Sequence, residues 1–206
     1  MMLRIVAALA VVLGIAGVLA FLTELGEAPW SPPAARHLRA MKSRTQAPLS
    51  YAPITFAEME SLPHHGTIHE DTAIEARGVS LEGYVQVLGR ATDGDYHLDF
   101  APALDHDGDL VPYLSAEITS GVRANAKGWT FERLLERFRP YRGGRTAWDQ
   151  PPRRARVSGW LMHDAPYEGS VPIPGWPKHL TQWEVHPVTK VEVWDDMLAR
   201  WDEVPR

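Results

Sequence analysis

Apolar and polar residues alternate with a period of two in five separate stretches between about residues 76 and 194. In the first stretch, glutamate and glutamine stand between small or apolar residues, which are Val79, Leu81, Gly83, Val85 and Val87. Successive side chains of a strand point to opposite sides of a sheet, so this pattern predicts strands with one buried face. The chain is therefore expected to be mainly β.

The other four stretches predict strands over 96–100, 110–119, 154–161 and 180–194. Asp93-Gly94-Asp95 and the segment from Asp105 to Asp109 are typical of turns between strands. Pro187 predicts a bulge or an edge position in the last strand, because proline cannot donate to a sheet ladder.

One helix is predicted between the third and fourth strands. Thr130 can cap it, Pro140 can end it, and Phe131, Leu134, Leu135 and Phe138 form one apolar stripe. A second, short helix is expected from Asp195 to Trp201.

The order strand, strand, strand, helix, strand, strand resembles that of an OB-fold, a five-stranded barrel, over about residues 76–194. An SH3-like or another small five-stranded barrel is the alternative. The segments Gly159 to Asp164 (GWLMHD) and Trp183 to Thr189 (WEVHPVT) resemble those of uncharacterised membrane-anchored bacterial proteins. OB barrels serve many unrelated roles, so this resemblance implies a fold and no activity.

The run from Ile5 to Leu22 is apolar or glycine throughout, and as a helix it would be about 27 Å long, enough to cross a bilayer. We expect residues 1–22 to be an uncleaved single-span anchor; a cleaved signal peptide is the alternative. Residues 23–75, which contain several prolines, are expected to be a tether and N-terminal extension, and residues 76–206 the barrel domain with its short C-terminal helix. We expect the barrel domain to be exported to the periplasmic or extracytoplasmic side, although Arg36, Arg39, Lys42 and Arg44 would favour the opposite topology.

The composition is that of a globular protein: 206 residues, 45% hydrophobic, with a net charge of −5. The absence of cysteine excludes disulfides, thiolate metal sites and a cysteine nucleophile.

Histidines and carboxylates recur in the outward phase of the predicted strands. If these strands are neighbours in a barrel, they could form a site for zinc or another divalent ion, with His97, Glu117, His163, Glu184 and His186 as candidate ligands. Asp95, Asp99 and Asp164 flank them. The alternative is an ordinary solvated barrel surface.

Asp93-Gly94-Asp95 resembles the turn before the second strand of staphylococcal-type nucleases, OB barrels in which it contributes a calcium-binding carboxylate. The chain departs from that family at Tyr96, where threonine is usual, and lacks an Asp-Thr-Pro-Glu segment after the third strand. The acidic stretch from Asp105 does not have the spacing of an EF-hand, because its sixth residue is Leu110 rather than glycine.

Two further segments are candidate contact surfaces. An arginine-rich stretch could bind an anionic partner, namely lipid headgroups, an acidic protein or nucleic acid: Arg137, Arg139, Arg142, Arg145, Arg153, Arg154 and Arg156. The proline-rich loop near residues 165–179 carries Tyr167 and Trp176, which could form an exposed aromatic anchor or fold back on the barrel.

The leading hypothesis is a non-enzymatic, membrane-anchored binding or accessory module that contacts membrane lipid and another membrane or envelope protein. One alternative is a divalent-metal-dependent hydrolase of the phosphoesterase or nuclease class, for which the polar residues would have to converge. Another is a module that binds single-stranded nucleic acid.

Overall fold

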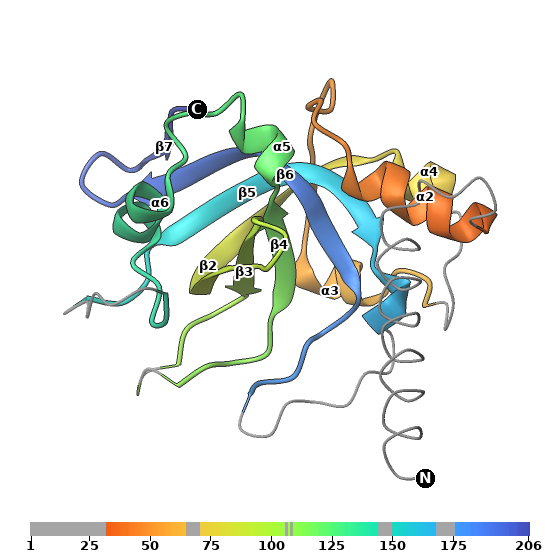
Figure 1. The fold of residues 1–206 in the computed structure, drawn as a ribbon. Helices are drawn as coiled ribbons and strands as arrows, with labels where there is room; N and C mark the ends of the chain where they lie inside the picture. The colour runs from red at the N-terminus through yellow and green to blue at the C-terminus, as the bar shows by residue number, and fades with distance from the viewer. Residues whose placement is uncertain (1–31, 65–70, 106, 108, 144–149, 168–175) are drawn as a thin grey trace, which may run out of the picture.

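A closed five-stranded barrel forms the body of the protein in the computed structural model, which describes residues 32–64, 71–105, 107, 109–143, 150–167 and 176–206 (Figure 1). Around the barrel, the strands follow the order β2, β3, β4, β6, β5 and back to β2. Their bounds are Gly78–Arg90 (β2), Tyr96–Ala101 (β3), Leu114–Ile118 (β4), Arg154–His163 (β5) and Trp183–Asp195 (β6). The expectation of a mainly β barrel is confirmed, and the strand order is compatible with an OB-type fold.

Strand β2 closes the barrel because it pairs with two different neighbours along its length. Gly78 to Tyr84 pair with β5, and Tyr84 to Arg90 pair with β3, with a register shift between Val85 and Val87. The pairing of β4 with β6 is parallel, with Ala116 opposite Val185, whereas the other pairings within the barrel are antiparallel.

The barrel interior holds the apolar half of each alternating strand. Helix α6 (Phe131–Phe138) covers one end of it with the apolar stripe that the sequence predicts, and Leu134 and Phe138 are fully buried. Thr130 caps this helix by accepting a hydrogen bond from the backbone N–H of Arg133 at 3.2 Å. The predicted helix is therefore confirmed, with its N-terminal cap.

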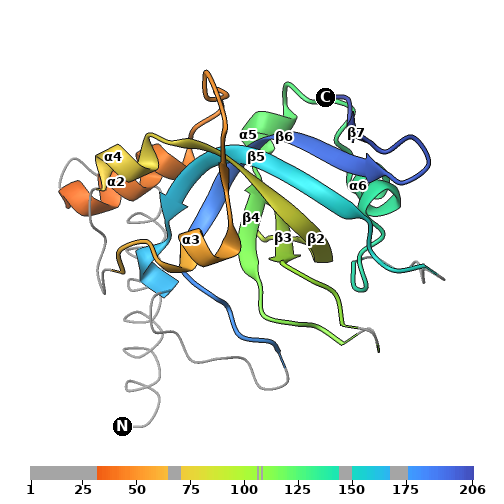
Figure 2. The ribbon, with the colours of Figure 1, turned by 180° about the vertical axis from the view of Figure 1, so that it is seen from behind.

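Residues before the barrel carry structure of their own. They form α2 (Pro33–Lys42), β1 (Ala52–Ile54), α3 (Phe56–Glu60) and α4 (Thr72–Glu75). Strand β1 pairs in parallel with β2, and Figure 2 shows α3 beside the barrel strands. Ile54 and Met59 are buried in the core. Residues 33–60, expected to lie within a tether, thus pack on the barrel as well as leading to it.

The expected helix from Asp195 to Trp201 is wrong. The chain instead turns and forms β7 (Arg200–Glu203), which pairs with the end of β6 and places Trp201 opposite Trp194. The carboxylate of Asp195 accepts the backbone N–H groups of Met197 and Leu198, and Ala199 has a φ of 48°. These local bonds hold a tight turn in place of a helix.

Pro187 lies where the pairing of β5 with β6 shifts register, around Gly159, as expected for a bulge. Helix α5 (Ser120–Arg123) and the 3₁₀ turn η1 (Ala165–Tyr167) complete the described elements. In the described part of the chain, no helix has both the length and the apolar character needed to cross a membrane. The predicted anchor at residues 1–22 lies outside the described residues.

Candidate functional site

Six polar side chains lie on the outer face of three neighbouring barrel strands. They alternate with core residues such as Leu98, Ala116 and Val185, so they must point away from the interior. We call this set the polar face: His97 and Asp99 on β3, Ser115 and Glu117 on β4, and Glu184 and His186 on β6. Because Ala116 is paired with Val185, the next residues, Glu117 and His186, come side by side.

Four members of the polar face form a continuous chain of ion pairs. His97 Nε2 lies 3.2 Å from Asp99 Oδ1, and His97 Nδ1 lies 3.0 Å from Glu117 Oε1. The other carboxylate oxygen of Glu117, Oε2, lies 3.0 Å from Nε2 of His186. Glu117 therefore bridges two imidazole rings from two different strands.

Electrostatics within this chain favour the charged forms of its central residues. Burial acts to lower the pKa of His97, but its hydrogen bonds with Asp99 and Glu117 outweigh burial and raise the pKa to about 10. Burial acts to raise the pKa of Glu117, and hydrogen bonds with His186 and His97 outweigh it and hold the pKa well below its usual range. At neutral pH the pair is an imidazolium beside a carboxylate.

Asp95 brings a second carboxylate to this region. The Asp93-Gly94-Asp95 turn is present: Asp93 accepts the backbone N–H of Asp95 at 3.1 Å, and Gly94 has a φ of 92°. The turn directs the Asp95 side chain toward the start of α5, where its Oδ1 accepts the backbone N–H of Ser120 at 2.6 Å. Burial and the charge of Asp93 raise the pKa of Asp95.

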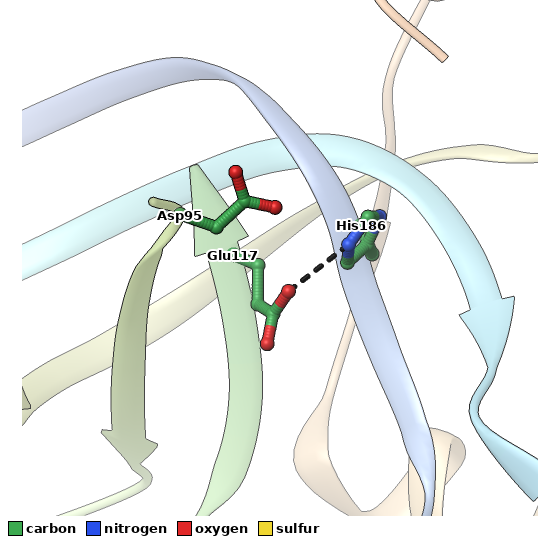
Figure 3. Close-up of side chains that lie close together, drawn as sticks. All are labelled: Asp95, Glu117 and His186. Atoms are coloured by element: carbon green, nitrogen blue, oxygen red, sulfur yellow. Dashed lines mark ion pairs between the residues drawn. The ribbon is translucent and has the colours of Figure 1, made fainter. Parts of the chain in front are cut away.

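Three potential metal ligands converge at this point (Figure 3). One ligand atom each from Asp95, Glu117 and His186 lie within 4.8 Å of one another. Asp95 and His186 are buried, and Glu117 is partly buried. Two carboxylates and one imidazole can together hold a divalent ion, and the remaining coordination positions would be open to water or substrate.

Glu184 lies on the same face and is buried beside other acids. Burial, followed by the negative charges of Glu117 and Asp164, raises its pKa well above the usual range. Asp164 is itself held by Lys42 of α2, with Nζ 2.9 Å from Oδ2. Helix α2 therefore contributes the ammonium group of Lys42 at the edge of the polar face.

The last residues of the proline-rich loop cover part of the polar face. The indole N–H of Trp176 donates to Asp99 Oδ2 at 3.1 Å, and the hydroxyl of Ser115 lies 2.8 Å from Nε2 of His179. Burial, and then the positive charge of His97, lower the pKa of His179. Trp176 thus folds back on the barrel, the second of the two expected arrangements. Tyr167 ends η1, and its side chain lies outside the described residues.

The structure brings together part of the predicted ligand set. His97, Glu117 and His186 are in contact, and Glu184 shares their face. His163 is not among them: it pairs with Trp183, its ring stacks on the Trp183 indole at 4.9 Å, and it points to the side of the sheet opposite Glu184. Sequence reasoning missed Ser115, His179 and Lys42, because their contacts depend on segments that meet only in the folded chain.

The predicted arginine-rich stretch divides into different environments. Arg154 and Arg156 are ion-paired with Glu82, and Arg156 also contacts Glu192. Burial, followed by the positive charges of Arg137 and Arg139, lowers the pKa of Arg153, and the Arg153 guanidinium donates to the backbone oxygen of Trp194 at 2.9 Å. Arg142 packs over the Trp176 ring, and Arg145 lies outside the described residues.

Comparison with known proteins gives no family for this chain. Neither a family model, a curated protein nor a solved structure matches it. The function must therefore be argued from the geometry of the site.

Proposed function

We propose that the protein binds one divalent cation through Asp95, Glu117 and His186, and that it is a metal-dependent hydrolase of phosphoesters. One observation carries this proposal: ligand atoms of these three side chains lie within 4.8 Å of one another. The residues come from the turn before β3, from β4 and from β6, which are neighbours in a rigid barrel. Such a scaffold supports a preformed ligand set.

The chemistry of the donors supports an ion of the zinc or manganese class. Imidazole favours zinc and related ions, whereas carboxylates also suit manganese and calcium. His97 touches the other oxygen of Glu117 and would fix the orientation of that carboxylate, as hydrogen-bond partners of metal ligands commonly do. Imidazole and carboxylate ligands bind a metal in their deprotonated forms, so affinity should increase with pH.

Hydrolysis is the reaction class that such a site supports best. A bound divalent ion lowers the pKa of its water and stabilises charge that develops on a phosphoryl oxygen. The polar face would position the substrate, and His97, which is partly exposed, is placed to contact it.

The first experiment measures metal in the full-length protein by elemental analysis, and then titrates zinc, manganese and calcium by calorimetry. We expect one equivalent of metal, and a loss of binding by at least about tenfold in Asp95→Asn and His186→Ala. His64→Ala is the matched control, because His64 is exposed and lies outside the polar face.

Activity is then measured on a phosphodiester and a phosphomonoester with and without the bound metal. Turnover that requires the metal and fails in His186→Ala supports the hydrolase. If the protein binds one equivalent of metal but hydrolyses neither ester, the metal site is supported and the proposed hydrolase activity is contradicted. No metal binding by the wild-type chain would contradict the whole proposal.

A membrane-anchored accessory module remains the second candidate function. The positive charges of Arg137 and Arg139, which lower the pKa of Arg153, favour it, because a cationic surface attracts anionic headgroups or an acidic protein. Sedimentation with vesicles that contain anionic lipid tests it, with neutral vesicles as control. Binding that is unchanged in Arg137→Gln/Arg139→Gln would exclude this surface.

A further inference from the structure

A concave surface lies on the barrel outside the polar face. It is a groove of about 620 Å³ between the segment from Tyr51 to Phe56 and the outer face of β2, β5 and β6. Its volume is within the range of small-molecule sites. The proposed metal ligands do not line this groove, and neither do Arg137, Arg139 and Arg153; Arg156 of the arginine-rich stretch does.

The floor of the groove consists of two parallel rows of side chains that cross the three strands. Ser80, Ser158 and Lys190 are paired across β2, β5 and β6 in one row, and Glu82, Arg156 and Glu192 in the next. The rows are two residues apart, which is about 7 Å along a strand. Buried core residues alternate with them, so the rows are fixed on the outer face.

Opposite charges alternate within this floor. Arg156 lies 2.6 Å from Glu82 and 3.4 Å from Glu192, and Lys190 lies 3.0 Å from Glu192. Two carboxylates and two cations therefore balance. A phosphate-rich ligand would need an excess of positive charge, and a metal ion an excess of negative charge, so the floor favours a ligand without net charge.

The groove is also lined by the hydroxyl residues Tyr51, Thr55, Ser80 and Ser158 and by the carbon-rich side chains of Pro53 and Phe56. Ser80 and Ser158 are hydrogen-bonded at 3.0 Å, and the hydroxyl of Tyr51 is bonded to Thr189 at 2.9 Å. The ring of Phe56 is stacked on Phe100 with centroids 5.9 Å apart, and Pro53 lies beside it in the lining. Hydroxyls both donate and accept, and so they match a ligand whose own groups do the same.

We propose that this groove binds an uncharged carbohydrate. A sugar presents hydroxyls that can pair with the alternating donors and acceptors of the floor, and C–H faces that can pack on the aromatic wall. The floor is a sheet face whose backbone groups are already paired, so it offers no strand edge to an extended peptide. The edge strand β1 lies in the wall of the groove, and a peptide is therefore the comparison ligand. The sugar could be a free oligosaccharide or part of a glycan polymer.

The test is calorimetric titration of the full-length protein, without sugar-based detergent, against chitotetraose, maltotetraose and cellotetraose. We expect at least one of them to bind with a dissociation constant of about 1 mM or tighter. Retention on insoluble chitin or cellulose would indicate a polymer source, and binding of the soluble oligosaccharide alone a free source. A short uncharged peptide serves as the comparison ligand.

Two variants locate the binding. Lys190→Met removes the ammonium but keeps the carbon stem, and should weaken binding about tenfold. Ser80→Leu fills the floor and should abolish binding. Lys178→Met is the matched control, because Lys178 is an exposed lysine outside the groove.

Absence of binding by all three oligosaccharides, or preference for the peptide, would overturn the proposal. Sugar binding that is unchanged in Lys190→Met, with the circular dichroism spectrum of the wild type, would also overturn it. Because the groove and the metal ligands do not share a residue, this result is independent of metal binding.

Discussion

Glu117 Oε2 lies 3.0 Å from His186 Nε2, although α5, α6 and β5 separate the two residues along the chain. The contact exists because β4 and β6 are parallel neighbours in the closed barrel. Closure of the barrel therefore creates the candidate site.

Loss of the Glu117 carboxylate should destabilise the fold even without metal. Glu117→Gln leaves two imidazole rings without their shared anion, and we expect a loss of roughly 3–5 kcal/mol in the free energy of unfolding. Urea unfolding with a chelator present measures it. The double variant with His186→Gln should lose less than the sum of the two single losses; strict additivity would show that the pair does not interact.

Stability should decrease as the pH rises above about 6.5. The pKa of His97 is about 10 in the folded protein against 6.5 ordinarily, so its contribution is complete below pH 6.5 and is lost as the pH approaches 10. The pKa of Glu117 is shifted in the opposite direction. Because it is lowered in the folded protein, the stability that Glu117 contributes is complete above pH 4.5 and is lost on acidification. Urea midpoints between about pH 5.5 and 9.5 should fall in the wild type and fall less in His97→Gln. Equal slopes in both proteins would contradict this role of His97.

Gly159 should tolerate no side chain. A Cβ there would lie 2.1 Å from the backbone oxygen of Pro187, at the bulge between β5 and β6. We expect Gly159→Ala to cost about 3 kcal/mol or more. Gly89→Ala is the control, since a Cβ at Gly89 meets nothing within 4 Å, and it should be stabilising by roughly 0.5–1 kcal/mol. Thermal unfolding of the two variants compares them, and similar melting temperatures would count against the close approach.

The helix that covers the barrel end should be essential to the core. Phe138 is fully buried, so Phe138→Ala should cost about 3–5 kcal/mol in urea unfolding. Leu198 is 58% exposed at the β6–β7 turn, and Leu198→Ala should change stability by no more than about 0.5 kcal/mol. A small loss in Phe138→Ala would mean that α6 is not part of the cooperative unit.

Alternation and capping made much of the barrel predictable. Val79 and Leu81, or Leu98 and Phe100, had to share a face, and that face is the core. The same argument placed His97, Glu117 and His186 on the outer face. Whether these side chains meet was left open by the sequence, and the parallel pairing of β4 with β6 brings Glu117 and His186 together.

Other features depended on contacts that a local pattern does not contain. The third strand was expected from Leu110, but Gln86 binds the backbone of Val111 with its side chain, and Tyr113 pairs with the segment around His179, so β4 begins at Leu114. His163 was expected at the site, but its register with Trp183 turns it to the other side of the sheet. The segment from Asp195 to Trp201 has a composition typical of helices. It forms a turn because the backbone N–H groups of Met197 and Leu198 donate to the Asp195 carboxylate.

Trp129 is 2% exposed, and its indole N–H donates to the backbone oxygen of Val204, itself fully buried. Gly128 lies against Pro205, where a Cβ would be 2.3 Å from the backbone oxygen. Val204 and Pro205, which contact Trp129 and Gly128, follow all five barrel strands along the chain. During synthesis they therefore leave the ribosome after those strands. A nascent chain that has not reached Val204 lacks the acceptor for the buried indole N–H of Trp129, so this part of the core forms only after Val204 has left the ribosome. Premature termination just before this point should yield a product that cellular proteases remove.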